Sequence, residues 1–426
     1  MNSTEYPRLG ERVFHTQLEN GLHIYVDQKK DFQKSYAFFA TNYGGIDMRF
    51  QLDGVWQDTP AGVAHFLEHK MFDTEDGNAL QDLAANGASP NAFTSSAITG
   101  YYFESTEKFY ENLKILLSFV SIPYFTQESV DKEQGIIGQE IRMIEDDPEN
   151  QVFFAMLEGL YDHHPIRTSI AGTIESISHI TAETLYACHR AFYNPANMVL
   201  CVAGDVDPER VCALAREILP REGRGDIPRD YGGAEEPRAA AHRKELRMEV
   251  STPIFQLGWK ADAPADGEER LRRDILGELC CEVLFGTSSP LYARLYSQGL
   301  VNKNFSYGYE DYPGCAFLVL GGESPDPDAL SAAIAAEAER IGREGVDEAL
   351  FQRLKKASYG ARVRSLNSFE HICVGLAQAH FGGMDFFRFP EVFDTITRAE
   401  VEEMLRATVT PERAALAVVL PKEAKA

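Results

Sequence analysis

The chain has 426 residues, of which 44% are hydrophobic and 25% are charged. This length exceeds one ordinary hydrophobic core, so we expect two domains of about 200 residues each. The 41 lysines and arginines are outnumbered by 65 aspartates and glutamates, which gives a formal net charge of −24. Such a charge repels phosphate backbones and anionic lipids, and it therefore disfavours nucleic-acid binding and membrane-surface roles.

The N-terminal residues and the cysteines both indicate a cytoplasmic protein. Residues 1–12 are polar and lack the apolar core of a signal peptide, and no segment approaches the ~20 apolar residues that cross a bilayer. The seven cysteines are odd in number and include no Cys-x-x-Cys pair. We therefore expect reduced cysteines and no cysteine metal site.

The first half predicts a mixture of strands and helices. Asn20-Gly21 lies between two apolar runs within residues 13–26, which predicts a β-hairpin. Hydrophobic periodicity then predicts, in chain order, a strand at 35–41, helices at 60–72 and 78–86, a strand at 101–104 leading into a helix that ends near 120, a helix at 127–145, a strand at 197–203 and a helix at 208–219.

The composition changes after residue 219. Residues 220–243 contain three prolines, several glycines and many charges, which is typical of a linker. We therefore predict a catalytic domain at 1–219, a linker at 220–245 and a second domain at 246–426. The second domain begins with a strand at 253–259 and ends with a strand at 414–420. Its helix at 276–285 resembles in position the helix at 60–72, with Cys280-Cys281-Glu282 in place of the histidines, so a duplicated second half would be chemically silent.

The residues with the clearest chemistry are His65-Phe66-Leu67-Glu68-His69. Residues four apart on a helix lie on one face, so both imidazoles can meet one metal ion. Glu68 projects toward the same face and can take a proton from a water molecule on zinc, whose pKa the metal lowers to about 7. Two buried histidines that share one carboxylate are the structural alternative. The inverted motif is typical of zinc peptidases, and we prefer that interpretation.

A catalytic zinc needs a third protein ligand. The helix at 127–145 carries Glu133 and Glu140, which are seven residues apart and therefore share a face. One can bind the metal while the other orients a ligand or substrate. Spacing does not rank the two glutamates and leaves His163 and His164 open as ligands, and a solvated acidic stripe is the alternative.

With these residues the sequence resembles the pitrilysin family of zinc peptidases, the inverzincins, which include insulysin and the mitochondrial processing peptidases. The resemblance rests on residues 62–69, on Glu140, which follows the motif after 140 − 69 = 71 positions, and on Glu133 seven residues before it. It implies that His65, His69 and Glu140 hold one zinc ion per chain. It also implies that Glu68 is the catalytic base and that Glu133 supports catalysis from beside the metal.

The resemblance covers nearly the whole first half. Asn91, Ala92 and Phe93 lie in a segment similar to the family's edge strand, which implies that they bind the substrate backbone. Further matches at 172–175, 180–181 and 193–198 look structural. The segments at 70–72 and 138–143 make the chain most similar to a bacterial, YmfH-like branch, whose members commonly accompany a zinc-less relative.

The second half departs from the family pattern. In the family an arginine and, seven residues later, a tyrosine bind substrate and stabilise the tetrahedral intermediate. Here Leu295 and the pair Val301-Asn302 stand at those positions, and Arg294 is one residue out of register. Either Tyr307 and Tyr309 replace the missing pair, or a homologous zinc-less subunit supplies it in a heterodimer. A homodimer is a further arrangement.

The resemblance implies an α+β fold with two homologous domains, each an antiparallel sheet packed with helices, as in the pitrilysin-type, LuxS-like metallopeptidases. It implies a zinc endopeptidase that hydrolyses peptides or unfolded segments in a chamber. Two other functions stay open, namely a dedicated maturation factor for one peptide or protein and a non-catalytic subunit of a heterodimeric peptidase.

Overall fold

The computed structural model describes residues 1–422, which form two compact units. The first unit contains residues 1–141, 168–231 and 363–387. The second contains residues 142–167 and 232–362 and the chain from 388 onward. The last four residues of the domain predicted at 246–426 lie outside the described part of the chain.

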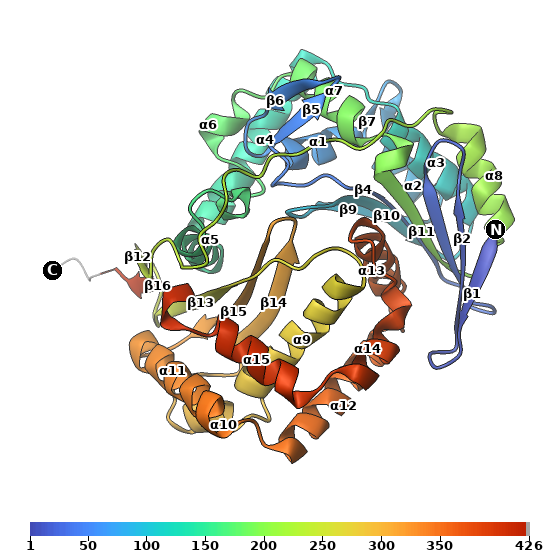
Figure 1. Cartoon of the computed structure of the whole chain (residues 1–426). Coiled ribbons are helices and arrows are strands. Elements are labelled where there is room, and N and C mark those ends of the chain that lie inside the picture. Colours follow the sequence, from blue (N-terminus) through green and yellow to red (C-terminus); the bar gives the residue numbers. More distant parts are fainter. Residues whose placement is uncertain (423–426) are drawn as a thin grey trace. The chain divides into compact units, whose positions relative to one another are not determined.

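The first unit is built on a seven-stranded sheet in the order β1-β2-β3-β11-β4-β10-β9 (Figure 1). The predicted hairpin forms, because β2 and β3 pair antiparallel on either side of Asn20-Gly21, where Gly21 has a φ of 90°. The strands are β1 (Asn2–Tyr6), β2 (Glu11–Gln17), β3 (His23–Gln28), β4 (Ser35–Thr41), β9 (Ser89–Thr94), β10 (Thr99–Ser105) and β11 (Met198–Gly204). Two short hairpins, β5 (Arg49–Leu52) with β6 (Val55–Asp58) and β7 (Asp73–Thr74) with β8 (Gly77–Asn78), lie outside this sheet.

The core of the first unit is at β4 and β11, whose residues are all buried. Both strands read as continuous apolar runs because helices cover both faces of the sheet at its centre. The helices of this unit are α1 (Val63–Met71), α2 (Ala79–Ala85), α3 (Phe109–Ser121), α6 (Ile174–Ile177), α7 (Ala182–Phe192), α8 (Pro208–Ile218), α13 (Phe369–Phe381) and most of α4 (Gln127–Asp146). Asn78 and Asp207 accept hydrogen bonds from the first turns of α2 and α8, which explains where these two predicted helices begin.

The second unit contains a five-stranded sheet in the order β12-β16-β13-β15-β14. Its strands are β12 (Arg243–Met248), β13 (Ile254–Ala261), β14 (Ser306–Tyr312), β15 (Cys315–Glu323) and β16 (Ala414–Pro421). Its helices are α5 (Pro148–Leu160), α9 (Glu268–Phe285), α10 (Pro290–Ser297), α11 (Pro327–Glu344), α12 (Glu348–Ser365), which ends just past the unit boundary, α14 (Phe389–Thr395) and α15 (Arg398–Thr408).

The two sheets repeat one topology. Five strands of the first, β3-β11-β4-β10-β9, correspond in order to β12-β16-β13-β15-β14, and α1, β9 and α4 correspond to α9, β14 and α12 in chain order. The prediction of an α+β fold with two homologous domains is therefore confirmed. Each sheet is mixed rather than wholly antiparallel, because β3 pairs with β11, and β12 with β16, in parallel. In the five-stranded repeat of each sheet, the last strand in the chain pairs with the first after several helices, which permits a parallel pair.

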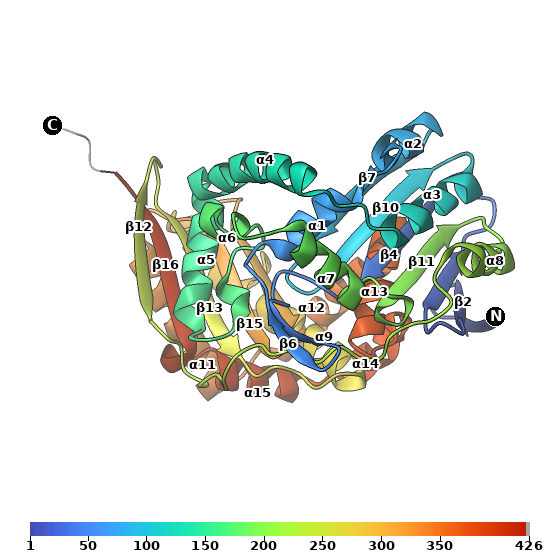
Figure 2. The same cartoon turned by 90° about the horizontal axis from the view of Figure 1, so that it is seen from above.

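Each unit also contains one helix from the other half of the sequence. Helix α5 follows α4 in the chain but packs on β13 and β16 of the second unit (Figure 2). Helix α13 follows α12 but packs on β11 and β4 of the first unit. The division of the chain into continuous domains at 1–219 and 246–426, joined by a linker at 220–245, stays a prediction. No helix in residues 1–422 is long and apolar enough to cross a membrane.

Candidate metal centre

Close backbone packing holds the N-terminal end of α1. Gly62 precedes the helix with a φ of 93°, and a Cβ there would lie 2.6 Å from the carbonyl oxygen of Ala171. Gly172, with a φ of 73°, would place a Cβ 2.4 Å from the carbonyl oxygen of Ala61. Only glycine accepts both the left-handed conformation and the contact. The hydroxyl of Ser176 then donates a hydrogen bond of 2.8 Å to the Ala61 carbonyl.

The apolar face of α1 determines which side chains remain for chemistry. Phe66 and Leu67 are fully buried in the core of the first unit. This orientation leaves His65 and His69 one turn apart on the same face, with ring centroids 4.6 Å apart in an edge-to-face arrangement at 67°. The two imidazoles face α4, as the i, i+4 spacing predicts.

Glu140 of α4 completes a three-residue group with the two histidines. Its Oε1 atom lies 3.6 Å from Nε2 of His65, and its Oε2 atom lies 3.6 Å from Nε2 of His69. One donor atom from each residue lies within 4.8 Å of the other two. Within residues 1–422, these three residues form the group whose donor atoms could hold a metal ion. The structure therefore brings together the three ligands that the sequence predicted, and it places Glu140 rather than Glu133 in the group.

The donor atoms fit a zinc ion. Bonds of about 2.0–2.1 Å at a tetrahedral centre place two ligand atoms about 3.3 Å apart. The observed nitrogen–oxygen distances of 3.6 Å are close to this separation and are too long for hydrogen bonds. Burial and the neighbouring His69 lower the pKa of His65 to about 4, so this imidazole is neutral, as a zinc ligand must be. Two imidazoles and one carboxylate are a donor set that suits zinc.

Glu133 lies behind His69 rather than in the metal group. Its Oε1 atom is 3.1 Å from Nδ1 of His69, on the side of the ring away from Glu140. The hydrogen bond with His69 lowers the pKa of Glu133 despite its partial burial, so the carboxylate is ionised and accepts the proton on Nδ1. Burial opposes protonation of His69, but Glu133 and the carboxylates of Glu68 and Glu140 raise its pKa overall. This field favours a cation beside the imidazole.

Glu68 is positioned by the end of strand β9. Its Oε2 atom accepts a hydrogen bond of 2.9 Å from the hydroxyl of Thr94, and the side chain is nearly buried. Burial raises the pKa of Glu68, although Thr94 and His69 lower it in part. A carboxylate with a raised pKa next to a metal group is suited to general acid–base chemistry.

Comparison with known proteins identifies the family. Residues 54–174 match the model for insulinase (peptidase family M16), and residues 179–358 match the model for the M16 inactive domain. The zinc protease YmfH of Bacillus subtilis is 39% identical over 423 residues, which cover 98% of this chain and 99% of that protein. The chain belongs to the M16 insulinase family of peptidases.

Solved structures agree with this assignment. The crystal structure of an M16-like peptidase from Alicyclobacillus acidocaldarius has a TM-score of 0.93 and 32% identity, and the match covers 99% of this chain and 100% of that chain. A protease from Helicobacter pylori has a TM-score of 0.84 over 96% of this chain and 100% of its own, but at 17% identity this likeness shows only the fold. The predicted similarity to the pitrilysin family and to its YmfH-like members is confirmed.

In this M16 chain the predicted substrate residues lie on a free sheet edge. Asn91, Ala92 and Phe93 are on β9, which forms one edge of the seven-stranded sheet and, within residues 1–422, pairs with β10 alone. Phe93 stacks on Phe38 with ring centroids 5.7 Å apart. The next residue on the strand, Thr94, contacts Glu68. The edge of β9 therefore ends beside the metal group.

The two alternative ligands named from the sequence do not join this group. His163 and His164 belong to the second unit, where their backbone N–H groups donate to Oε1 of Glu235 at 2.6 and 2.8 Å. The Nε2 atom of His164 lies 2.9 Å from the carbonyl oxygen of Pro313. These contacts give both histidines a structural place in a turn.

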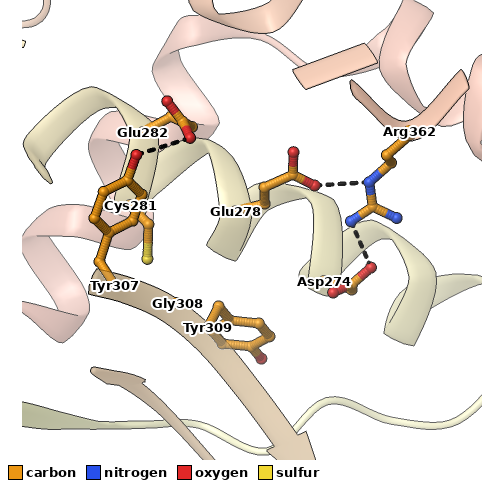
Figure 3. Close-up of a pocket in the computed structure, with 8 residues that line it drawn as sticks. All are labelled: Asp274, Glu278, Cys281, Glu282, Tyr307, Gly308, Tyr309 and Arg362. Carbon is orange, nitrogen blue, oxygen red and sulfur yellow. Dashed lines mark hydrogen bonds and ion pairs between the residues drawn. The ribbon is translucent and has the colours of Figure 1, made fainter. Parts of the chain in front are cut away.

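The second unit contains the tyrosines proposed to replace the family's arginine–tyrosine pair. Tyr307 and Tyr309 line a cavity of about 260 Å³ between β14 and α9 (Figure 3). The hydroxyl of Tyr307 donates to Oε1 of Glu282 at 3.1 Å, and the ring of Tyr309 packs against Gly277 of α9. Leu295, at the family's arginine position, is buried.

The sequence predicted no role in the site for Lys70, whose side chain is only 1% exposed beside the metal group. A signal was present in the periodicity of α1. The spacing i, i+3, i+4, i+7, i+8 of the buried face is followed by Val63, Phe66, Leu67, Lys70 and Met71. A lysine in an apolar stripe indicates a buried charge that needs a partner.

Proposed function

We propose that this chain is a zinc-dependent endopeptidase. The observation that carries the proposal is the convergence of His65, His69 and Glu140 on one point, with Glu68 beside them. When bound there, zinc polarises a scissile carbonyl and lowers the pKa of a water molecule. Glu68 accepts a proton from that water and returns it to the leaving amine, and Thr94 holds its carboxylate in place.

The substrate in this proposal is an extended peptide or an unfolded segment. Among residues 1–422 no strand pairs with the outer edge of β9, where a substrate strand would add to the sheet along Asn91, Ala92 and Phe93. The N–H group of Ala92 already donates to Oδ1 of Asn91 at 2.9 Å. A folded protein cannot present its backbone in this way without local unfolding. The net charge of −24 also favours peptides that carry basic residues.

A partner subunit belongs to the proposal. Leu295 is buried at the family's arginine position, and the pair Val301-Asn302 stands at the tyrosine position. Arg294 donates instead to Oε2 of Glu337 at 3.1 Å. We propose that a homologous zinc-less subunit supplies the pair in a heterodimer. Tyr307 and Tyr309 within this chain are the second candidate, and a second copy of the chain is the third.

The proposal also concerns the range of substrates and the cellular location. A dedicated maturation factor would use the same metal group on a single peptide or protein, and the sequence preference of cleavage separates it from a general peptidase. All seven cysteines are free and buried, which supports a cytoplasmic location.

The test is digestion of a mixed peptide pool, followed by mass spectrometry. The zinc-loaded protein should cleave the pool, and Glu68→Gln should retain one zinc while its turnover falls by about 100- to 10,000-fold, because an amide cannot accept the proton. Glu111→Gln, an exposed glutamate on α3, is the matched control and should behave as the parent. Loss of zinc in Glu68→Gln would instead make Glu68 a ligand, and equal turnover would refute the proposed base.

A further inference from the structure

One charged side chain beside the metal group has no role in the proposed hydrolysis. Lys70 follows His69 on α1, and its ammonium group lies on the buried face of the helix. Removing an ammonium group from water costs several kcal/mol unless nearby charges compensate. A neutral apolar residue would fill this position of the stripe without that cost, so the contacts of Lys70 indicate what the charge does.

Lys70 lies between two carboxylates of the first unit. Its Nζ atom is in close contact with Oδ2 of Asp73 and lies 3.9 Å from Oε2 of Glu133. The other oxygen of Glu133, Oε1, is the atom that lies 3.1 Å from Nδ1 of His69. The ammonium group and the imidazole thus engage opposite oxygens of one carboxylate.

We propose that Lys70 is a positioning residue that acts on the metal site through Glu133. By attracting one oxygen of Glu133, it fixes the plane of the carboxylate so that the other oxygen meets Nδ1 of His69. An imidazole that donates its Nδ1 proton to a carboxylate has its lone pair on Nε2, the atom that faces Glu140 at 3.6 Å. The inference rests on the proposed zinc site and adds a residue to it.

The surroundings of Glu133 offer a matched control. Lys132 precedes Glu133 on α4 and carries the same charge, but its side chain is exposed. Water and salt screen an exposed charge, so its effect on Glu133 is small, whereas the buried ammonium of Lys70 acts at close range and with fixed geometry. If only the amount of positive charge near the site matters, replacing either lysine should have the same effect. If Lys70 positions Glu133, only its replacement should weaken the metal site.

The experiment measures zinc affinity by competition with a chelator. Lys70→Met should weaken zinc binding by about 10- to 100-fold, the range found when a residue behind a metal ligand is lost. Lys70→Arg keeps the charge and should recover most of the affinity, and Lys132→Met should stay within about twofold of the parent. Lys70→Gln, with a shorter polar head, is the second variant should Lys70→Met not fold.

A double-mutant cycle separates positioning from a structural effect on α1. If Lys70 acts through Glu133, the variant Lys70→Met/Glu133→Gln should bind zinc no more weakly than Glu133→Gln alone. Losses that multiply in the double variant would overturn the inference, as would an unchanged affinity in Lys70→Met. Absence of zinc binding by the parent protein would refute the zinc site itself, which is a different outcome.

Discussion

Helix α1 of the first unit and helix α9 of the second occupy the same place in two sheets of one topology, yet they have opposite chemistry. Helix α1 presents two imidazoles to a carboxylate of α4, with the donor atoms spaced for an ion. Helix α9 presents Asp274 and Glu278 to α12, the counterpart of α4, and Arg362 of α12 binds both carboxylates at 2.7 Å (Figure 3). In the second unit the guanidinium group of Arg362 is therefore a cation supplied by the chain itself. The first unit instead offers donor atoms that could bind a metal cation from solution.

The comparison shows how one architecture can hold either a group of metal-ligating type or a network of ion pairs. In the first unit the charges of Glu133 and Glu140 favour a cation beside His69. His65 is neutral, so its ring keeps a nitrogen lone pair that can bind a metal ion. In the second unit Asp274 and Glu278 raise the pKa of Arg362 further and fix its guanidinium between them. A guanidinium neutralises the carboxylates but cannot lower the pKa of a bound water molecule as zinc does.

The largest expected effect is complete loss of zinc when the first site is broken. His69→Ala removes one of three ligands, so the purified protein should contain less than about one tenth of an equivalent of zinc by elemental analysis. The second unit should not take up the metal, because Arg362 already compensates its carboxylates. A full equivalent of zinc in His69→Ala would place the ion elsewhere and end the comparison.

The next largest effect concerns the missing oxyanion donors. If the proposed heterodimer forms, the isolated chain should be slow, and a homologous zinc-less subunit with the arginine–tyrosine pair should raise turnover by about 100- to 1,000-fold, the range expected when an oxyanion donor is restored. Full activity of the chain alone, lost in Tyr307→Phe or Tyr309→Phe, would show instead that the second unit contributes hydroxyls to the reaction.

A stability measurement tests the built-in cation of the second unit. Arg362→Met leaves Asp274 and Glu278 without their partner, and because the three side chains are 24–38% exposed we expect a loss of about 1–2 kcal/mol in the free energy of unfolding. Arg364→Met changes an exposed arginine of the same helix and should cost less than about 0.5 kcal/mol. Chemical denaturation followed by circular dichroism gives both values, and equal losses would make the ion pairs of Arg362 unimportant.

The two units should also differ in their response to acid. In the first unit His15, His23 and His380 form a cluster, with Nε2 of His15 lying 2.9 Å from Nδ1 of His23, and with rings of His23 and His380 4.4 Å apart. Burial lowers the pKa of all three, that of His380 to about 4, and neighbouring histidines add to the effect on His23 and His380. Charged histidines at these distances would repel one another.

The sign of the acid effect follows from these pKa shifts. Because the unfolded chain binds protons near pH 6.5 and the folded cluster does not, the first unit should lose stability as the pH falls from about 6.5 to 4. Asp27 opposes this trend, since burial raises its pKa to about 7. In the second unit the pKa of Glu235 is lowered to about 2 despite its partial burial, by Lys260 and by three backbone N–H groups, so its contribution is lost only between about pH 4.5 and 2.

Hydrogen exchange at pH 7.5 and 5.0 measures this smallest effect. After correction for intrinsic rates, β11 should lose protection before β16, and His380→Phe should reduce the loss in β11 because it removes one proton-binding group. His179→Phe, at an exposed histidine of the same unit, is the control. Equal acid sensitivity of β11 and β16 would contradict the difference between the units.

Local sequence patterns predict the helices, the strands and the chemical groups of the site. The His-x-x-Glu-His motif and the glutamates at 133 and 140 lie on helices whose periodicity is local, so the chain predicts which side chains share a face. The Asn-Gly hairpin and the buried strands β4 and β11 follow from equally local signals. The repeat of the helix at 276–285 was visible for the same reason, and the structure confirms it as α9.

Which faces of these helices and strands meet is visible only in the folded structure. Glu133 and Glu140 share one face of α4, and their roles depend on where α1 crosses that helix, which no local pattern specifies. The partner of Lys70, the ion pairs of Arg362, the parallel strand pairs and the exchange of α5 and α13 all join segments far apart in the chain. Such contacts form because buried apolar faces and buried charges need partners, and the nearest suitable partner in space is seldom the nearest in sequence.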